Sequence, residues 1–181
     1  MSDMVIVIDV QNGFVNAKAE HVVKPIASFL ERWLKEDDDR LAVFTRFHNP
    51  PGSKWEQLIH WDRLRMSPEV DLVADMQRLI DDGTYSRNIV VADKETYTSL
   101  TPQVRDLIRK RDVKRLYLCG IATDGCVLKT AIDAFEEGDL VPVILTDLCA
   151  SHAGPAIHDA GLLLAGRFIG SDQLLTAADI Y

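Results

Sequence analysis

The sequence contains few cysteines, a minority of basic residues and no long hydrophobic run. Its three cysteines are an odd number without Cys-x-x-Cys spacing, which argues against a disulfide framework or a zinc knuckle. No apolar stretch approaches the roughly 20 residues of a membrane span, and no basic segment precedes the first apolar run, so neither a span nor a signal peptide is predicted. Lys and Arg total 20 against 28 Asp and Glu, and the net charge of −8 argues against a broad nucleic-acid surface.

The rest of the composition is that of an ordinary globular domain. Hydrophobic residues make up 47% and charged residues 27% of the 181 positions, enough to form a core without disulfides. The length predicts one domain over residues 1–181. Unpaired cysteines favour a reducing, cytoplasmic location. The expected partner is a small-molecule substrate, with no nucleic acid and no membrane.

Apolar runs and helical spacing alternate along the chain. The runs are rich in β-branched residues and predict strands buried on both faces of a parallel sheet, over 4–8, 41–45, 89–92, 116–119 and 141–146. Helical spacing predicts helices over about 22–34, from Thr101-Pro102 onward, and over about 124–137 and 155–168. This alternation predicts a three-layer α/β/α fold with a central, mostly parallel sheet of five or six strands.

Two places depart from this regular pattern. Pro142 lies early in the last apolar run, so that strand is predicted to be an edge strand or to start late. The segment 48–87 is irregular and holds Trp55 and Trp61, which predicts a functional lid or an interface. The two tryptophans are interpreted mainly as packing residues of that segment.

Reactive side chains follow three of the predicted strands. Asp9 follows the first strand, Asp93 and Lys94 follow the third, and a turn ending at Cys126 follows the fourth. Because the carboxyl ends of parallel strands share one edge, we expect Asp9, Lys94 and Cys126 to converge. A helix N-terminus favours a thiolate, and a carboxylate beside the thiol can take its proton and pass it to a leaving group. Each residue alone has ordinary structural roles, and it is their combination that favours a catalytic site.

Three motifs occur in this order along the chain: Val7–Phe14, Asp93–Lys94 and Cys119–Val127. Two further segments, 130–134 and 146–151, belong to the same pattern. In these motifs the sequence resembles the isochorismatase-like cysteine hydrolases, a superfamily that includes nicotinamidases, N-carbamoylsarcosine amidohydrolases and isochorismatases. The resemblance covers essentially the whole chain. It implies the α/β fold and a hydrolase.

By this resemblance Cys126 is the nucleophile, Asp9 the general acid and base, and Lys94 the third member of a catalytic triad. The bond between Ile121 and Ala122 corresponds to a cis peptide bond, and the backbone N–H groups of Ala122 and Cys126 to an oxyanion hole. The implied reaction is hydrolysis of a C–N amide-type bond in a small molecule. It passes through a thioester on the cysteine and needs no cofactor.

Two other functions stay open. One is an isochorismatase-type vinyl-ether hydrolase, although that reaction does not need a cysteine nucleophile. The other is a non-catalytic family member that acts as a binding module. The chain carries Gly125 where a typical member has a bulkier residue, which allows a looser turn before the cysteine. Family members are commonly oligomeric, so a homo-oligomer, dimer or tetramer, is expected.

Nicotinamidases bind a divalent metal ion through an Asp-x-His motif after the second strand and a further histidine. The matching segment here begins at Arg46 and ends at His48, so a guanidinium stands where the ligand carboxylate would be, and it cannot bind a metal. His60 lies downstream, but two histidines without a carboxylate make a poor site, so no metal site is predicted. Arg46 is instead interpreted as a fork for an anionic or carbonyl-bearing substrate or as half of a salt bridge. The candidate substrate-binding residues are Phe14, Arg46, Trp61, Tyr97 and Ile121.

Two other classes share the predicted sheet but lack support. A receiver-like signalling domain would have paired carboxylates after the first strand, whereas Asp9 follows Ile8, and no lysine follows the fifth run. A dinucleotide-binding domain would have Gly-x-Gly-x-x-Gly in the same place, where the chain has Asp9–Gly13.

Overall fold

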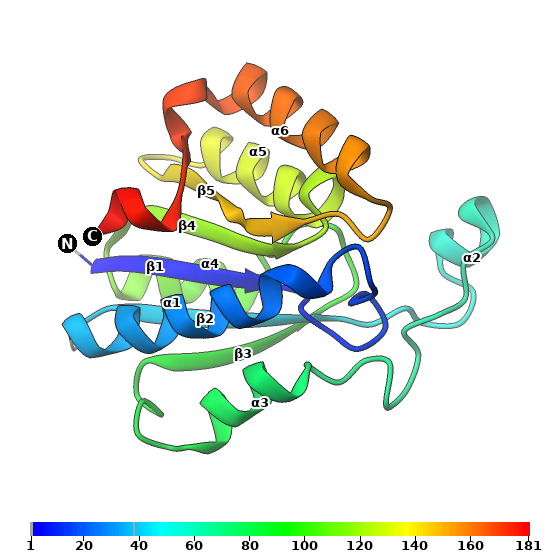
Figure 1. Cartoon of the computed structure of the whole chain (residues 1–181), viewed down its shortest axis with the longest axis horizontal. Coiled ribbons are helices and arrows are strands. Elements are labelled where there is room, and N and C mark those ends of the chain that lie inside the picture. The colour runs from blue at the N-terminus through cyan, green and yellow to red at the C-terminus, as the bar shows by residue number, and fades with distance from the viewer. Residues whose placement is uncertain (1, 38) are drawn as a thin grey trace.

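The computed structural model describes residues 2–37 and 39–181, and within them a six-stranded parallel sheet forms the centre (Figure 1). The strand order is β3-β2-β1-β4-β5-β6. The strands are β1 (Ser2–Ile8), β2 (Leu41–Phe47), β3 (Ile89–Lys94), β4 (Val113–Ile121), β5 (Val141–Ala150) and β6 (Leu174–Leu175). The predicted parallel sheet is confirmed, and only the two-residue β6 escaped prediction because it is too short to show a pattern.

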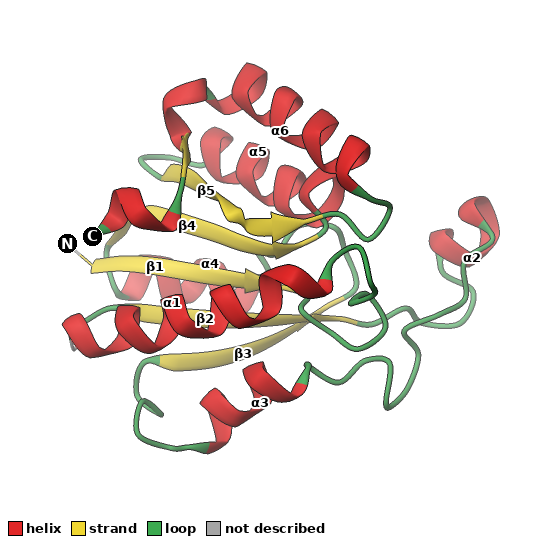
Figure 2. Cartoon of the chain, viewed as in Figure 1, coloured by secondary structure: helices red, strands yellow, loops and turns green. Residues whose placement is uncertain are grey.

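Six α-helices connect and cover the strands in the described chain: α1 (Val23–Glu36), α2 (Lys54–Ile59), α3 (Ala74–Asp81), α4 (Pro102–Lys110), α5 (Leu128–Glu136) and α6 (Pro155–Ile169). Helices α1 and α3 lie in front of the sheet in Figure 1, α4 lies behind it, and α6 packs along α5. Figure 2 shows α2 between long loops beyond the carboxyl ends of the strands. The four predicted helices are confirmed, and α2 and α3 are additions within the irregular segment.

Local signals explain several element boundaries. The Thr101 side chain accepts the Val104 N–H at the start of α4, where Pro102 occupies the first turn. Gly138, with φ +60°, lies just past the end of α5, where a glycine commonly ends a helix. The prediction for Pro142 is wrong: β5 begins at Val141 and lies between two strands. The proline is tolerated there because β6 pairs only further along β5.

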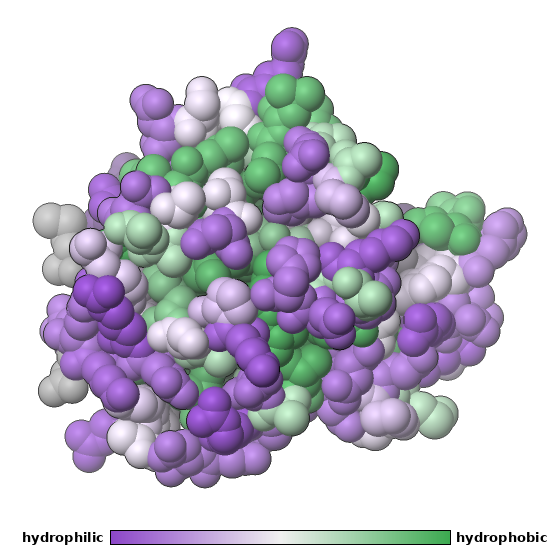
Figure 3. Space-filling model, in the orientation of Figure 1, coloured by the Kyte–Doolittle hydropathy of each residue, from purple (hydrophilic) through white to green (hydrophobic). Residues whose placement is uncertain are grey.

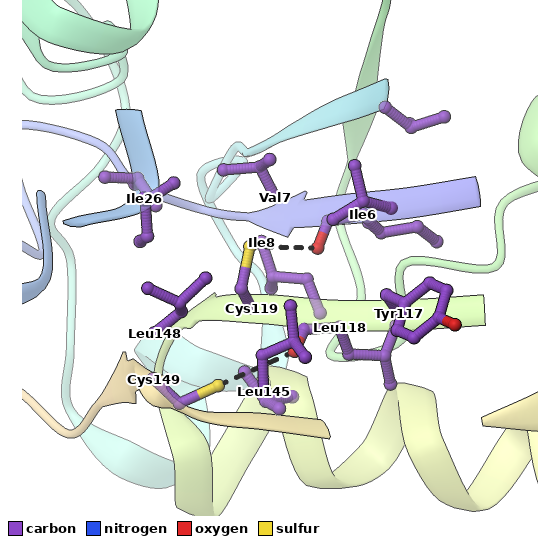
Figure 4. Packing of buried hydrophobic residues seen from close by; sticks show 14 of the residues in the cluster. Ile6, Val7, Ile8, Ile26, Tyr117, Leu118, Cys119, Leu145, Leu148 and Cys149 are labelled. Atoms are coloured by element: carbon purple, nitrogen blue, oxygen red, sulfur yellow. Dashed lines mark hydrogen bonds between the residues drawn. The ribbon is translucent and has the colours of Figure 1, made fainter. Parts of the chain in front are cut away.

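Two of the three cysteines belong to the core. The Cys119 thiol donates to the Ile6 carbonyl oxygen over 3.7 Å, and the Cys149 thiol to the Leu118 carbonyl oxygen over 3.8 Å (Figure 4). Both side chains are buried among apolar residues of β1, β4 and β5, and all three cysteines are free. Both cysteines are therefore packing residues of the core.

One glycine sets how closely β4 approaches β1. Gly120 pairs with Ile8 and has φ +113°, and a Cβ at this position would lie 2.2 Å from the Ile8 carbonyl oxygen. Only a residue without a side chain therefore allows the two strands to meet directly before Asp9 and the turn to Cys126. This position is also the point where the strand order reverses, between β1 and β4.

We expect Gly120→Ala to lower the free energy of unfolding by at least about 3 kcal/mol, because overpacking adds to a backbone conformation that L-residues avoid. Gly138→Ala is the matched control, since its φ is also positive but no atom lies within 4 Å of the added Cβ. The control should lose only about 1 kcal/mol. Urea unfolding of both variants measures the difference, and equal losses would show that the strand contact does not matter.

Exposed apolar surface concentrates in two places. Hydrophobic surface covers parts of α6 and the protruding α2 segment (Figure 3). The side chains include Leu58 and Ile59 on α2 and Leu163 and Phe168 on α6. The expected homo-oligomer would bury such surface, and it stays a prediction. Within the described residues, no helix has the length and apolar character needed to cross a membrane.

Candidate active site

Asp9 follows β1 directly and is fully buried. Its φ of +51° lies in the left-handed region, which aspartate tolerates better than most residues. The Thr45 hydroxyl on β2 donates to Asp9 Oδ1 over 2.7 Å and accepts the Asp9 N–H over 3.3 Å. The neighbouring strand therefore fixes both the backbone and the carboxylate of Asp9.

Lys94 ends β3 and reaches the same point from the other side of β2. Its Nζ lies 2.6 Å from Asp9 Oδ2, and both side chains are fully buried. The ammonium also donates to the carbonyl oxygens of Thr96 at 2.9 Å and Tyr97 at 3.2 Å, and to Cys126 Sγ at 3.5 Å. The ammonium thus bridges the carboxylate and the thiol.

Cys126 lies in a π-helical turn, Thr123–Val127, between β4 and α5. The turn is closed by hydrogen bonds from the N–H groups of Gly125 and Val127 to the Ala122 carbonyl oxygen. The peptide bond between Ile121 and Ala122 is cis. A Cβ at Gly125 would come no closer than 4.0 Å to another group, so this glycine leaves open space beside the thiol.

The electrostatics of the three side chains are coupled. Burial raises the pKa of the Cys126 thiol, the Asp9 carboxylate raises it further, and the Lys94 ammonium opposes both. Burial acts to lower the pKa of Lys94, but Asp9 and Cys126 outweigh it and hold that pKa above 10.5. The resting state therefore has a neutral thiol beside a charged lysine. Burial is the largest single influence on the pKa of this thiol.

A cavity of about 560 Å³ opens onto Cys126. Its walls come from the loops after β1, β3 and β5, the end of β2, the α2 segment, the π-helical turn that carries Cys126, and α5. The lining residues are mostly aromatic or aliphatic: Phe14, Phe47, Trp55, Ile59, His60, Trp61, Tyr97, Ala122, Asp124, Gly125, Cys126, Leu128, Lys129, Ile132 and His152. The Phe14 and Trp61 rings are stacked at 5.8 Å. The cavity can therefore receive a small, largely apolar molecule above the thiol.

Comparison with known proteins identifies the family of this chain. The family model of the Isochorismatase domain matches residues 3–168. The chain belongs to the isochorismatase family. Its sheet and helices have the isochorismatase-like α/β fold.

Among solved structures of this fold, nicotinamidase PncA from Bacillus subtilis superposes with a TM-score of 0.84 at 23% identity, covering 97% of this chain and 99% of that one. N-carbamoylsarcosine amidase from Thermoplasma acidophilum gives 0.75 at 16% identity, covering 97% and 95%. At these identities the likeness concerns the fold.

Curated isochorismatase family relatives match over shorter stretches. Isochorismatase domain-containing protein 2 of Xenopus laevis is 34% identical over 61 residues, which is 33% of this chain and 29% of the relative. An uncharacterized isochorismatase family protein of Bacillus subtilis is 32% identical over 69 residues, 38% of each chain. The matched stretches thus span well under half of these relatives.

The structure brings together most, but not all, of the predicted site residues. Asp9, Lys94 and Cys126 converge, and Ala122 lies beside the thiol. Phe14, Trp61 and Tyr97 line the cavity as predicted substrate-binding residues should. Trp55 lines it too, so the two tryptophans form the cavity wall as well as packing the α2 segment.

Two of the predicted substrate-binding residues, Arg46 and Ile121, do not line the cavity. Arg46 does not line the cavity, because alternation along β2 turns it away from the side that Thr45 presents to Asp9. Its guanidinium instead binds Asp93 on β3 through two hydrogen bonds of 2.7 and 3.0 Å, which is the salt-bridge alternative. Ile121 is fully buried at the end of β4 and does not reach the cavity.

The residues at the position of the nicotinamidase metal site do not fit a metal ion. Arg46 has no lone pair to offer and is held by Asp93, whose Oδ1 also lies 3.2 Å from His48 Nε2. Burial acts to raise the pKa of Asp93, but Arg46 and His48 lower it more. His60 ends α2 and faces the cavity. Within residues 2–37 and 39–181, no three His, Cys, Asp or Glu side chains form a metal-binding group.

Sequence reasoning missed three contributors to the site. Thr45 orients Asp9, and its only signal was a hydroxyl inside an apolar strand. The Gln11 side chain accepts the Phe47 N–H at 2.7 Å and donates to the carbonyl oxygens of Phe47 and Val70, which ties the loop after β1 to the end of β2. His152, which follows β5, lines the cavity, with its ring 5.4 Å from that of Phe14.

Proposed function

We propose that this protein is a cysteine hydrolase that cleaves a C–N amide-type bond of a small molecule. The observation that carries the proposal is the buried contact of Lys94 Nζ with both Asp9 Oδ2 at 2.6 Å and Cys126 Sγ at 3.5 Å, where the thiol opens to a cavity. Membership of the isochorismatase family and the fold shared with a nicotinamidase and an N-carbamoylsarcosine amidase support it.

The first half of the proposed reaction forms a thioester. Asp9 takes the proton of the Cys126 thiol as sulfur attacks the carbonyl carbon, so charge develops on the substrate oxygen rather than on a resting thiolate. The backbone N–H groups of Ala122 and Cys126 stabilise that oxyanion. Asp9 then returns the proton to the departing amine, and the C–N bond breaks. Lys94 keeps Asp9 oriented throughout and favours its charged form before and after each proton transfer.

The second half releases the acid. Water enters where the amine has left, Asp9 takes one of its protons, and the oxygen attacks the thioester carbon. Collapse of the second tetrahedral intermediate breaks the C–S bond, and the sulfur regains its proton from Asp9. The products are a carboxylic acid and an amine or ammonia, and no cofactor takes part. A thiol of this kind stays active in a reducing compartment, which suits the cytoplasm.

The shape of the cavity limits the substrate that we propose. Aromatic side chains from three separate segments, Phe14, Trp55 and Tyr97 among them, surround the approach to the thiol. Such walls favour a flat or apolar acyl group of a few carbon atoms over a highly charged one. A vinyl-ether substrate is the second candidate, but that reaction leaves the buried thiol without a role.

The proposal is tested by ammonia release from a panel of nicotinamide, carbamoylated amino acids, biuret, ureidoacrylate and maleamate. We expect at least one amide to be hydrolysed, and the acid product identifies the acyl group. The acylated protein should be trapped by rapid acid quenching and found by mass spectrometry as an adduct on Cys126. Turnover of an amide without any adduct under burst conditions would contradict the thioester mechanism.

We expect chelators to leave this activity unchanged. The donor set around Arg46 and Asp93 cannot hold a divalent ion, so EDTA and added zinc should each alter the rate by less than about twofold at catalytic enzyme concentrations. A zinc-dependent nicotinamidase assayed in parallel serves as the positive control for chelation. Loss of activity with EDTA and its recovery with one metal would refute the prediction.

A further inference from the structure

A buried threonine hydroxyl connects the nucleophile to a different element of the fold. Thr130 Oγ1, on α5, donates to the Cys126 carbonyl oxygen over 2.6 Å and accepts the Ser99 N–H over 2.9 Å. Thr130 and Ser99 are both fully buried, so solvent cannot replace either bond. Bonding to the carbonyl four residues earlier is common for threonine in helices. The second bond, to a residue 31 positions away, is what makes this hydroxyl a bridge.

The segment that Thr130 contacts is also the segment that holds Lys94. The Lys94 ammonium donates to the carbonyl oxygens of Thr96 and Tyr97, which lie three and two residues before Ser99. One short loop after β3 therefore fixes the ammonium through two carbonyl groups and fixes the cysteine backbone through one N–H group. Only the contact with the cysteine backbone passes through a side-chain hydroxyl, that of Thr130.

We propose that Thr130 is a positioning residue that sets the distance between the Cys126 thiol and the Lys94 ammonium. The proposal rests on the proposed role of Cys126 as nucleophile. The turn that carries Cys126 is π-helical, so regular α-helical hydrogen bonds do not hold this turn by themselves. The Lys94 Nζ and Cys126 Sγ atoms lie 3.5 Å apart, and the attraction between an ammonium and a thiolate weakens as this distance grows, so a shift of the turn weakens the contact.

The consequence concerns the reactivity of the thiol. Asp9, directly after β1, and Lys94, on β3, act on the thiol in opposite senses. The other charged or titratable side chains that face it line the cavity: Asp124, Lys129, His60 and His152. If the hydroxyl is lost, the turn moves relative to the loop, and the lysine stabilises the thiolate less. The thiolate fraction at any pH below the thiol pKa then falls, by tenfold for each unit that the pKa rises.

The test uses iodoacetamide, which alkylates the thiolate and needs no substrate. Thr130→Val removes the hydroxyl with little change in shape, Thr130→Ser retains it, and Thr130→Ala removes it with less bulk if valine is not accommodated. Thr146→Val is the matched control, because the Thr146 hydroxyl donates to the Leu175 carbonyl oxygen over 3.1 Å at the far strand pair of the sheet. Peptide mapping restricts the measurement to Cys126.

We expect alkylation of Thr130→Val and Thr130→Ala to be roughly tenfold slower than wild type between pH 7 and 9, while Thr130→Ser and Thr146→Val stay within about threefold. A Thr130→Val protein that is folded and less stable to heat, but is alkylated at the wild-type rate, would overturn the proposal, since the hydroxyl would then be structural only. Equal slowing in Thr130→Ser would overturn it too. If wild type hydrolyses no amide, the proposed function fails, but the alkylation rates still decide whether Thr130 positions the thiol.

Discussion

Cys126→Ala should reduce amide hydrolysis by at least about a thousandfold, because the substrate then has no nucleophile and only the oxyanion hole and the cavity remain. The fold should survive. Cys126 is 7% exposed and lines the cavity, and the substitution removes one atom beside open space. The measurement is kcat/KM on the best amide of the panel, with circular dichroism to check that the variant is folded.

Cys149→Ala is the matched control for this experiment. Its thiol is buried beside β4, donates to the Leu118 carbonyl oxygen and lies outside the cavity lining. We expect its activity to remain within about threefold of wild type, with a loss of unfolding free energy on the order of 1 kcal/mol for the lost bond and packing. Full turnover of the amide by Cys126→Ala would contradict covalent catalysis.

Lys94→Met should produce the largest loss of stability. The variant keeps the apolar part of the side chain but leaves the Asp9 carboxylate buried without its partner at 2.6 Å, which costs about 3–5 kcal/mol in comparable pairs. Activity should fall as well, since the carboxylate then takes up a proton and cannot serve as a base. Urea unfolding at pH 7 measures the first effect, and amide turnover the second.

The double variant Asp9→Asn, Lys94→Met separates charge from packing. Because it removes both charges, it should recover at least half of the stability lost in Lys94→Met while remaining inactive. A double variant less stable than Lys94→Met would show that hydrogen bonding to Thr45, rather than charge, dominates this site.

The same pair also affects the pH dependence of stability. The folded-state pKa of Lys94 lies above its ordinary 10.5, so its contribution to stability is fully present below pH 10.5 and is lost as the pH rises through the folded value. Lys94→Met should lack this alkaline loss. The buried thiols act in the same direction from lower pH, since burial raises the pKa of Cys149 from 9.0 to about 12.

Several features of the site were readable from residue order. Asp9, Lys94 and the segment ending at Cys126 each follow an apolar run, and parallel strands place such positions at one edge of the sheet. The same reasoning failed for Arg46, because residue order identifies the end of a strand but not the face of the sheet to which a side chain points. Because side chains alternate along β2, Thr45 points to Asp9 while Arg46 points to Asp93.

The sequence by itself determined the parallel sheet, most of the helices and the convergence of the three reactive side chains, because hydrophobic periodicity and strand-end positions are local properties. Only the tertiary structure decided the rest. The cavity walls come from segments far apart in the chain, and the neutral state of the thiol follows from burial among them. The hydroxyl bridge through Thr130 likewise joins residues 31 positions apart, a distance that no local pattern encodes.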